Sequence, residues 1–357
     1  MISLGGPGRP PQAGVLVETT RPSESRVIGL VEGVLGRARA GALVASVEID
    51  AALLRPPSGP VSRAELAQAL NLLLFDDLTR RVPAGALYVL DRVRRGGKVV
   101  HDHGAVRTVL GETGALPTGE RALTRVLAPL GYEVGEVYPL DRLGMTGRAW
   151  RHRDFPETIA QYFVSELHVD RFSSGFGEAA ARVFGASRDP LPEAALAALE
   201  ELEAEGRLPA EAAGRILPDL AGAFDRAHPA PALADYERLL AESAEAAWIA
   251  TEGNAFNHAT DRVADVAALS LEELALGRPI KDRVEVSASG RVLQTAYRAA
   301  RVERPFVGPD GALVLRPVPG SFFEFITRHL QPDGRLDLGF DTSNAQAIFK
   351  MTAPVLA

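Results

Sequence analysis

The chain has 357 residues, of which 46% are hydrophobic and 24% charged, and its formal net charge is −7 at pH 7. These values are typical of a soluble globular protein with one large or two small domains. The acidic balance and the lack of a Lys/Arg block argue against nucleic acid as a partner. The absence of cysteine excludes disulfides, thiolate zinc sites and cysteine nucleophiles.

The same composition limits location and metal chemistry. No apolar run approaches the roughly 18 residues that a membrane span needs, and the start of the chain, MISLGGPGRPPQAG, lacks the features of a signal peptide. We therefore expect a cytoplasmic protein with no membrane partner. Any metal must be held by His, Asp or Glu, and such nitrogen and oxygen donors favour iron, manganese or zinc.

The first half of the chain predicts helices followed by a strand-rich module. Apolar residues at three- and four-residue steps predict helices in residues 22–50 and 63–82. A strand is expected over KVVHDHGAVRTVL, then a helix that Thr118 caps and Gly131 ends, then strands EVGEVYPL and QYFVSELHV. We assign residues 1–90 to an N-terminal helical segment that packs on the core, and 91–175 to a first module.

The second half repeats this order after a change in composition. Residues 176–250 are rich in Ala, Glu and Leu and predict a helical insertion. A second module, 251–357, follows with a strand at NAFNHATDRV, a short helix at LSLEELALG, a hairpin around Ser289-Gly290 and a strand at SFFEFITRH. The predicted fold is α+β, with two paired βαβββ-like modules forming one curved mixed sheet in a compact catalytic unit.

Three segments carry candidate metal ligands. His258 lies in a polar, strand-like run with no evident packing role, His103 lies in HDHGAVRT, and Glu324 lies in FFEFI. Two imidazoles and one carboxylate form the facial triad of non-haem Fe(II) oxygenases. Each residue alone has a structural explanation: Asn254, Asn257 and Thr260 could satisfy a buried His258, and Arg328 could pair with Glu324.

Arg107 is a candidate partner for an acidic substrate. It follows His103 by four residues (107 − 103) and would share its strand face, about 13 Å away at roughly 3.3 Å per residue. A small acid bound at a metal on His103 could extend a carboxylate towards Arg107, whose planar fork suits bidentate pairing. The structural alternative is a solvent-exposed Arg107 and an edge-strand His103.

Two other histidine patterns offer alternatives. His101 shares the predicted face of His103, and His-x-His is also a cupin pattern, but the next glutamate is only Glu112. His168-Val169-Asp170 matches the start of the iron site of 2-oxoglutarate-dependent hydroxylases, with His228 as a distal histidine. His228 lies in proline-flanked helical sequence, where that fold needs a strand.

Together, six motifs resemble the 2-oxoadipate dioxygenase/decarboxylases, or 2-hydroxyglutarate synthases, of the vicinal oxygen chelate superfamily. Their order and spacing carry the likeness (258 − 103 = 155 and 324 − 258 = 66). The motifs are DHGAVRT (102–108), LGYEVGEVYPL (130–140), FVSEL (163–167), GNAFNHATDRV (253–263), LQTA (293–296) and FFEF (322–325).

This resemblance implies a site and a reaction. It places the iron ligands on His103, His258 and Glu324, the substrate-carboxylate arginine on Arg107, and a polar position beside the pocket on Gln294. It implies Fe(II) as cofactor and dioxygen as co-substrate, with oxidative decarboxylation of a small 2-oxo acid and hydroxylation of the shortened acid. 2-Oxoadipate would give 2-hydroxyglutarate.

Other functions stay open at this point. A relative with the same iron chemistry could act on an amino or hydroxy acid in a biosynthetic pathway. A lyase or isomerase of the glyoxalase-like superfamily would use the metal only as a Lewis acid, and a binding protein would only sequester its ligand. Substrate chain length, product stereochemistry and oligomeric state are not encoded in these motifs.

Overall fold

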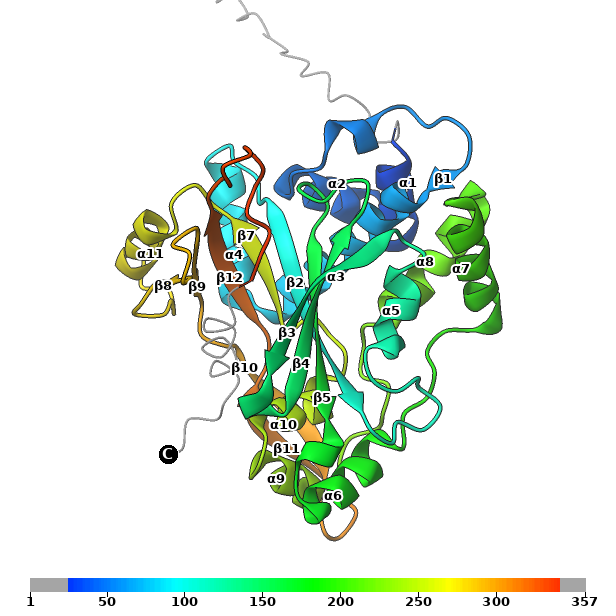
Figure 1. The fold of residues 1–357 in the computed structure, drawn as a ribbon, viewed down its shortest axis with the longest axis vertical. Coiled ribbons are helices and arrows are strands. Elements are labelled where there is room, and N and C mark those ends of the chain that lie inside the picture. Colours follow the sequence, from blue (N-terminus) through cyan, green and yellow to red (C-terminus); the bar gives the residue numbers. More distant parts are fainter. Residues whose placement is uncertain (1–24, 341–357) are drawn as a thin grey trace, which may run out of the picture.

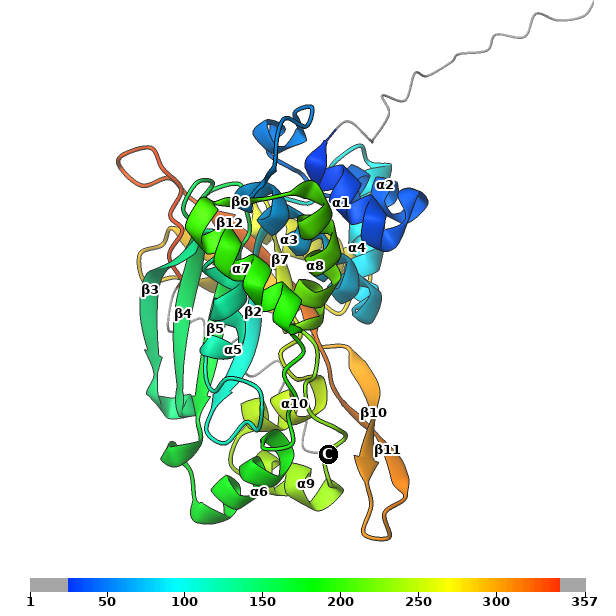
Figure 2. The same cartoon turned by 90° about the vertical axis from the view of Figure 1, so that its right-hand side faces the viewer.

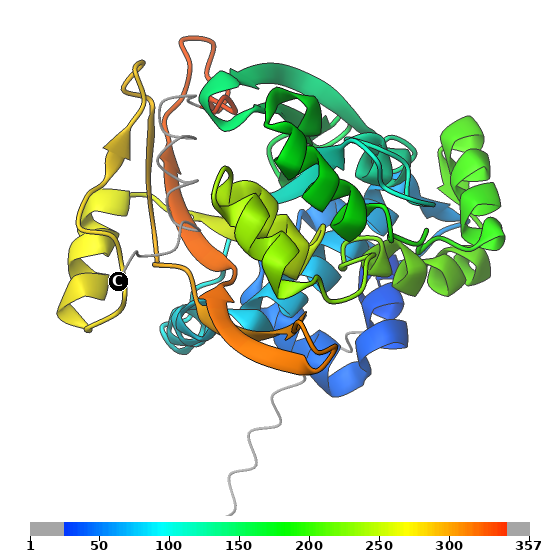
Figure 3. The ribbon, with the colours of Figure 1, turned by 90° about the horizontal axis from the view of Figure 1, so that it is seen from below.

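The computed structural model describes residues 25–340, and its centre is a curled, mixed eight-stranded sheet (Figure 1). Figure 3 shows the sheet curving from the green strands of residues 132–152 round to the gold strands of residues 285–296. In spatial order its strands are β3 (Tyr132–Leu140), β4 (Met145–His152), β5 (Gln161–His168), β2 (His101–Leu110), β7 (His258–Arg262), β12 (Phe322–Arg328), β9 (Val292–Ala296) and β8 (Glu285–Val286).

The sheet consists of two modules with the same topology. The first runs β2, α5 (Arg121–Leu127), β3, β4, β5, and the second runs β7, α11 (Val266–Ala275), β8, β9, β12. In each, the first strand pairs in parallel with the last, and the other pairs are antiparallel. Antiparallel pairing of β2 with β7 joins the modules. The predicted α+β fold of two paired βαβββ modules is therefore confirmed.

Helices near the N-terminus cover the outer face of the sheet. The Phe75 ring lies 6.1 Å from that of Phe323, and the Tyr88 ring lies 4.7 Å from that of Phe325, so these helices bury the outer face of β12. Ser62 and Glu65 form a capping box at the start of α3. The helices are α1 (Arg26–Leu35), α2 (Arg37–Ser46), α3 (Arg63–Arg81) and α4 (Pro83–Arg94).

The Ala/Glu/Leu-rich stretch is helical, as predicted, and divides into two groups. Its middle helices pack beside α1 and α3, where β1 (Val61–Ser62) pairs with β6 (Arg207–Leu208), and the others lie together below the sheet (Figure 2). These helices are α6 (Ser174–Phe184), α7 (Glu193–Glu205), α8 (Ala210–Gly222), α9 (Leu233–Leu240) and α10 (Ala244–Glu252). The boundaries between the four predicted segments stay a prediction.

Several local expectations were wrong or incomplete. Helix α5 begins at Arg121, and Thr118 does not cap it, because the Thr118 hydroxyl bonds to the backbone of Gly111 instead. Strand β4 and the hairpin of β10 (Arg301–Val307) and β11 (Leu313–Pro319) were not predicted. The β8–β9 hairpin is confirmed, with Gly290 in its turn at φ +70°.

Short 3-10 helices complete the described elements at Ala51–Leu54, Asp141–Leu143 and Val169–Arg171. Within residues 25–340, every helix is too short or too polar to cross a bilayer.

Candidate metal centre

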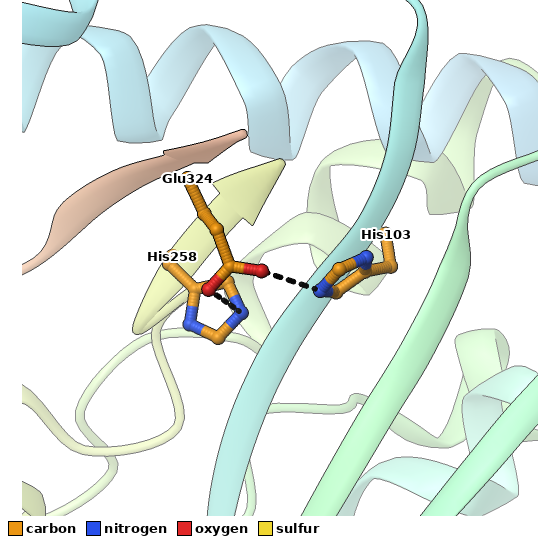
Figure 4. A group of neighbouring side chains, drawn as sticks. All are labelled: His103, His258 and Glu324. Carbon is orange, nitrogen blue, oxygen red and sulfur yellow. Dashed lines mark ion pairs between the residues drawn. The ribbon is translucent and has the colours of Figure 1, made fainter. Parts of the chain in front are cut away.

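The three predicted ligands meet on the inner face of the sheet, on three adjacent strands. Thr260 of β7 pairs with His103 of β2 on one side and with Glu324 of β12 on the other, so all three side chains share a face. His258 lies two residues before Thr260 on the same face. One ligand atom of each of His103, His258 and Glu324 lies within 4.8 Å of the other two (Figure 4).

The Glu324 carboxylate lies between the two imidazole rings (Figure 4). Its Oε1 is 3.5 Å from His103 Nε2, and its Oε2 is 3.8 Å from His258 Nε2. The two rings stand almost perpendicular, with centroids 5.4 Å apart. All three residues are at most 4% exposed. The Nε2 atoms and the carboxylate oxygens therefore converge on one buried point.

Hydrogen bonds to neighbouring residues orient both histidines. His103 Nδ1 lies 2.8 Å from Asp102 Oδ1, and His258 Nδ1 lies 3.2 Å from Asn257 Oδ1. Both partner oxygens are acceptors, so each Nδ1 carries a hydrogen, and in the neutral ring Nε2 keeps the lone pair that a metal needs. Metal-binding histidines are held in this way by outer hydrogen bonds, which fix the tautomer and the ring orientation.

The surroundings shift the pKa of each of the three residues. Burial lowers the pKa of His258 to about 3, which keeps the ring neutral. Burial alone would lower the pKa of His103, but hydrogen bonds to Asp102 and Glu324 outweigh it and raise that pKa. Burial alone would raise the pKa of Glu324, but His258 and His103 outweigh it and lower that pKa. Glu324 is therefore a carboxylate.

The donor set fits a divalent cation. Glu324 Oε2 is buried and has no hydrogen-bond partner in the described part of the chain, and such an anionic oxygen is costly to bury unless a cation compensates it. Two imidazoles with one carboxylate suit iron, manganese or zinc. In residues 25–340, no other three His, Asp or Glu side chains converge in this way.

The duplicated topology explains why the site offers three ligands. His258 pairs with Phe322 and Thr260 with Glu324, whereas in the first module His103 pairs with Gln161 and Ala105 with Phe163. Phe163 thus occupies the position that corresponds to Glu324. Because its side chain has no ligand atom, the first module contributes one ligand and the second contributes two.

The structural alternative for His258 holds in part, because Asn257 bonds to its Nδ1, while Nε2 faces Glu324. Arg328 does not pair with Glu324, because its guanidinium bonds to Asp102. The Thr260 hydroxyl lies 3.1 Å from His103 Nε2 and 3.4 Å from Glu324 Oε1, so it lies inside the site rather than satisfying His258. Side chains two residues apart on a strand share a face, so the position of His258 could have indicated that Thr260 also faces the site. Nothing in the sequence indicated the pairing of Arg328 with Asp102.

The other candidate histidines lie elsewhere. A β-bulge between His101 and His103 turns His101 to the opposite face, where it packs on Phe75 and Phe256, so the expectation that the two histidines share a face was wrong. His168 Nε2 lies 2.9 Å from the Thr146 hydroxyl, away from the centre.

His228 is also absent from the centre. It bonds to the backbone carbonyls of Pro229 and Ile249. The cupin and 2-oxoglutarate-hydroxylase patterns therefore form no site in the described residues.

Arg107 is buried on the same face of β2 as His103. It is 2% exposed, and its guanidinium carbon lies 4.9 Å from the ring of Trp248. Burial lowers its pKa to about 10, against the opposing effect of Glu245, so the side chain stays charged at neutral pH. The Arg107 charge helps to lower the pKa of His258, which places it within electrostatic range of the centre. The structural alternative of a solvent-exposed Arg107 was therefore wrong.

Gln294 lies on β9, on the same face of the sheet as Glu324 and on the side of β12 away from β7. Its amide donates to Glu285 Oε2 at 3.3 Å, and Lys281 donates to Glu285 Oε1 at 2.9 Å. Its strand partner is Ile326, two residues beyond Glu324. A direct role of Gln294 in substrate binding stays a prediction.

Phe340 separates the centre from a hollow in the surface. Its ring lies 4.8 Å from that of His103 and also lines a cavity of about 450 Å³ between β3 and the β8–β9 hairpin. Tyr138, Val292 and Asp337 line the same cavity. No sequence pattern indicated this position of Phe340.

Comparison with known proteins agrees with this geometry. The family described as 2-oxoadipate dioxygenase/decarboxylase matches residues 81–347. The crystal structure of a glyoxalase superfamily protein from Ralstonia eutropha JMP134 is similar at 53% identity and a TM-score of 0.85, covering 88% of this chain and 98% of that one. No curated protein matches the chain.

Two hydroxyglutarate synthases share the fold. The enzyme from Oryza sativa, solved in complex with 2-oxoadipate, has 20% identity and a TM-score of 0.64, covering 84% of this chain and 96% of its own. The enzyme from Pseudomonas putida, solved with the same acid, has 22% identity and a TM-score of 0.53, covering 83% and 74%. The vicinal oxygen chelate fold is thus confirmed, and the chain belongs to the 2-oxoadipate dioxygenase/decarboxylase family.

Proposed function

We propose that this protein is an Fe(II)-dependent dioxygenase that oxidatively decarboxylates a small 2-oxo acid and hydroxylates the shortened acid. 2-Oxoadipate would give 2-hydroxyglutarate. The observation that carries the proposal is the convergence of His103, His258 and Glu324 at one buried point, with one carboxylate oxygen left without a partner, in a member of this family. A cytoplasmic location stays a prediction.

The overall reaction is balanced without a separate reductant. One 2-oxo acid and one dioxygen give carbon dioxide and one 2-hydroxy acid. One oxygen atom enters the new carboxylate, and the other enters the hydroxyl group. The bound metal would supply dioxygen activation and a chelating centre for the acid.

Each residue of the site has a role in this proposal. His103, His258 and Glu324 would hold the metal, and Asp102 and Asn257 keep both Nε2 atoms directed at it. Because the ligands are at most 4% exposed, the surrounding strands exclude bulk water.

Arg107 would orient the acid by pairing with its carboxylate. Burial against Trp248 keeps the guanidinium away from bulk water. The charge of Arg107 therefore acts more strongly on a bound acid than it would in water. This assignment predicts that Arg107→Lys weakens the use of the acid, because an ammonium group lacks the bidentate fork.

The test is a balance of oxygen and carbon dioxide. Protein purified anaerobically and loaded with Fe(II) should consume dioxygen and release carbon dioxide from 2-oxoadipate in equal amounts. Glu324→Gln, which keeps the shape of the side chain but removes its charge, should abolish both. Iron binding without turnover of any acid in a chain-length panel of 2-oxo acids would overturn the proposed reaction.

The same assay separates the alternatives. Faster oxygen uptake with amino or hydroxy acids than with 2-oxo acids would indicate an oxidative decarboxylase that acts on amino or hydroxy acids. Product formation without oxygen, supported by Ni(II), Zn(II) or Mn(II), would indicate a lyase or isomerase. Ligand binding with no conversion under any of these conditions would indicate a binding protein.

A further inference from the structure

We propose that Gln161 is a substrate-binding residue, and that its side-chain NH2 group donates a hydrogen bond to an oxygen atom of the acid held at the metal centre. This inference rests on the proposed function, because it takes the ligand to be an acid bound beside His103. Gln161 is 1% exposed and belongs to β5.

The strand register places Gln161 beside the centre. It is the parallel partner of His103, so the two side chains project from the same face of neighbouring strands, which lie about 4.8 Å apart. In the second module the corresponding position is Phe322, whose ring stacks on the metal-ligand candidate His258 with centroids 4.7 Å apart. Gln161 and Phe322 therefore occupy corresponding positions in the two modules, each directly beside a histidine of the candidate site.

A neighbouring arginine fixes the orientation of the amide. Arg151 Nε donates to Gln161 Oε1 at 3.1 Å, and Arg151 Nη2 donates to the carbonyl of Leu338 at 3.3 Å. Gly135 leaves room for this arginine, since a Cβ there would lie 2.8 Å from Arg151 Nε. The oxygen end of the amide therefore faces Arg151, and the NH2 group forms the other end.

The NH2 group is the part of Gln161 that lacks a partner. Gln161 Nε2 is buried and makes no hydrogen bond within the described range 25–340. A buried donor left unpaired carries the full cost of its lost hydration. An acceptor supplied by a ligand would remove this cost, so the protein is organised to bind an acceptor at this position.

The chemistry of the donor defines the ligand class. An amide NH2 group only donates, and it therefore suits a carboxylate, keto or hydroxyl oxygen. An acid that chelates a metal beside His103 brings such oxygens next to β5. Together with Arg107 from β2, Gln161 would give the acid two donors of different kinds, one charged and one neutral.

The experiment compares two near-isosteric variants, Gln161→Met and Gln161→Glu. Anaerobic calorimetry on Fe(II)-loaded protein would measure the dissociation constants of 2-oxoadipate and of oxalate, a small chelator with only acceptor oxygens. We expect Gln161→Met to weaken binding of both about 10-fold, as for loss of one hydrogen bond. Gln161→Glu should weaken it more, because its carboxylate repels the acid.

The order of the two variants separates substrate binding from a structural role. A structural role would make Gln161→Glu the milder change, because its carboxylate still accepts from Arg151. Gln68→Met, a substitution of a buried glutamine in α3, is the matched control and should leave both constants unchanged. Metal content should stay at the wild-type level in every variant.

Three results would overturn the proposal: unchanged binding in Gln161→Met, a milder effect of Gln161→Glu, or loss of metal from either variant. Failure of the proposed function gives a different pattern. In that case wild-type protein would not bind 2-oxoadipate, while oxalate binding would still fall in Gln161→Met.

Discussion

Arg328 and Asp102 are 226 residues apart in the sequence and form a fully buried ion pair, with Arg328 Nε 3.0 Å and Nη2 2.9 Å from Asp102 Oδ1. The same carboxylate oxygen bonds to His103 Nδ1. Burial alone would raise the pKa of Asp102, but Arg328 and His103 outweigh it and lower that pKa. Arg328 of β12 thus holds the Asp102 carboxylate, and Asp102 in turn orients the His103 ring of β2.

We predict that Arg328→Met destabilises the fold and weakens metal binding. The substitution leaves the Asp102 charge buried without its main partner, which costs about 3–5 kcal/mol. Loss of the support for His103 should lower metal affinity about 10- to 100-fold. Urea denaturation and a chelator competition would measure the two effects. Arg335→Met, at a largely exposed pair with Asp333, should change neither; equal losses in both variants would contradict this role of the buried pair.

We predict that His258→Ala removes metal binding whereas His329→Ala does not. His258 Nε2 faces the Glu324 carboxylate, while His329 is exposed just beyond the end of β12. Loss of one of three ligands leaves two, too few for a stable protein site of this kind. Metal analysis after dialysis would give the stoichiometry of each variant. Full iron retention in His258→Ala would refute the ligand assignment.

We predict that alanine at Gly104 lowers the free energy of unfolding, whereas alanine at Gly214 raises it. A Cβ on Gly104 would lie 2.5 Å from the ring of Phe256, which is 2% exposed and packed against Tyr162. Gly104→Ala should therefore cost about 1–3 kcal/mol of unfolding free energy. Gly214 lies exposed within α8, where an added Cβ would meet only Leu30 Cδ2 at 3.9 Å, an ordinary van der Waals contact, and Gly214→Ala should stabilise by about 0.5–1 kcal/mol. Thermal melting curves of the two variants should shift in opposite directions.

We predict that Asp261 makes the fold less stable as the pH rises. Burial raises its pKa to about 7, even though Tyr88 and Val100 donate hydrogen bonds to it. The unfolded value is about 3.9. Between these values the folded state binds more protons than the unfolded state, so this group's contribution is fully favourable below about pH 4 and is lost as the pH rises through 7.

Asp261→Asn should remove this dependence. The unfolding free energy of Asp261→Asn relative to wild type should rise by up to about 4 kcal/mol between pH 4 and pH 8, at about 1.4 kcal/mol per pH unit. Urea denaturation across this range would measure the difference. Asp170→Asn, at an exposed position, should track wild type, and parallel curves for Asp261→Asn and wild type would contradict the buried-acid explanation.

The sequence predicted the parts of the site that follow from period and motif. The strands that carry His103, His258 and Glu324 show plain strand patterns, and the three residues meet as expected. The duplicated order of strands and helix was also visible, because turns and periodicity changes separate its elements. Local patterns were sufficient for these features.

Features that depend on register or on distant partners could not be predicted. A bulge adds one residue to β2 and reverses the face of His101, and no periodicity reports such an insertion. Gln161 looks like any polar residue at the start of a strand, and only its pairing with His103 gives it meaning. Arg328 has two plausible acidic partners, Glu324 on its own strand and Asp102 far away, and only the folded sheet distinguishes them.

The central position of β7 also has a consequence for how the chain folds. Its pairing with β2 joins Ala105 to His258, 153 residues apart (258 − 105), and its pairing with β12 joins Thr260 to Glu324, 64 apart (324 − 260). Such non-local pairs form slowly because loop-closure entropy must be overcome first. An ion that needs all three strands stabilises only the chain in which both pairings are complete, so metal loading would report the end of folding rather than initiate it.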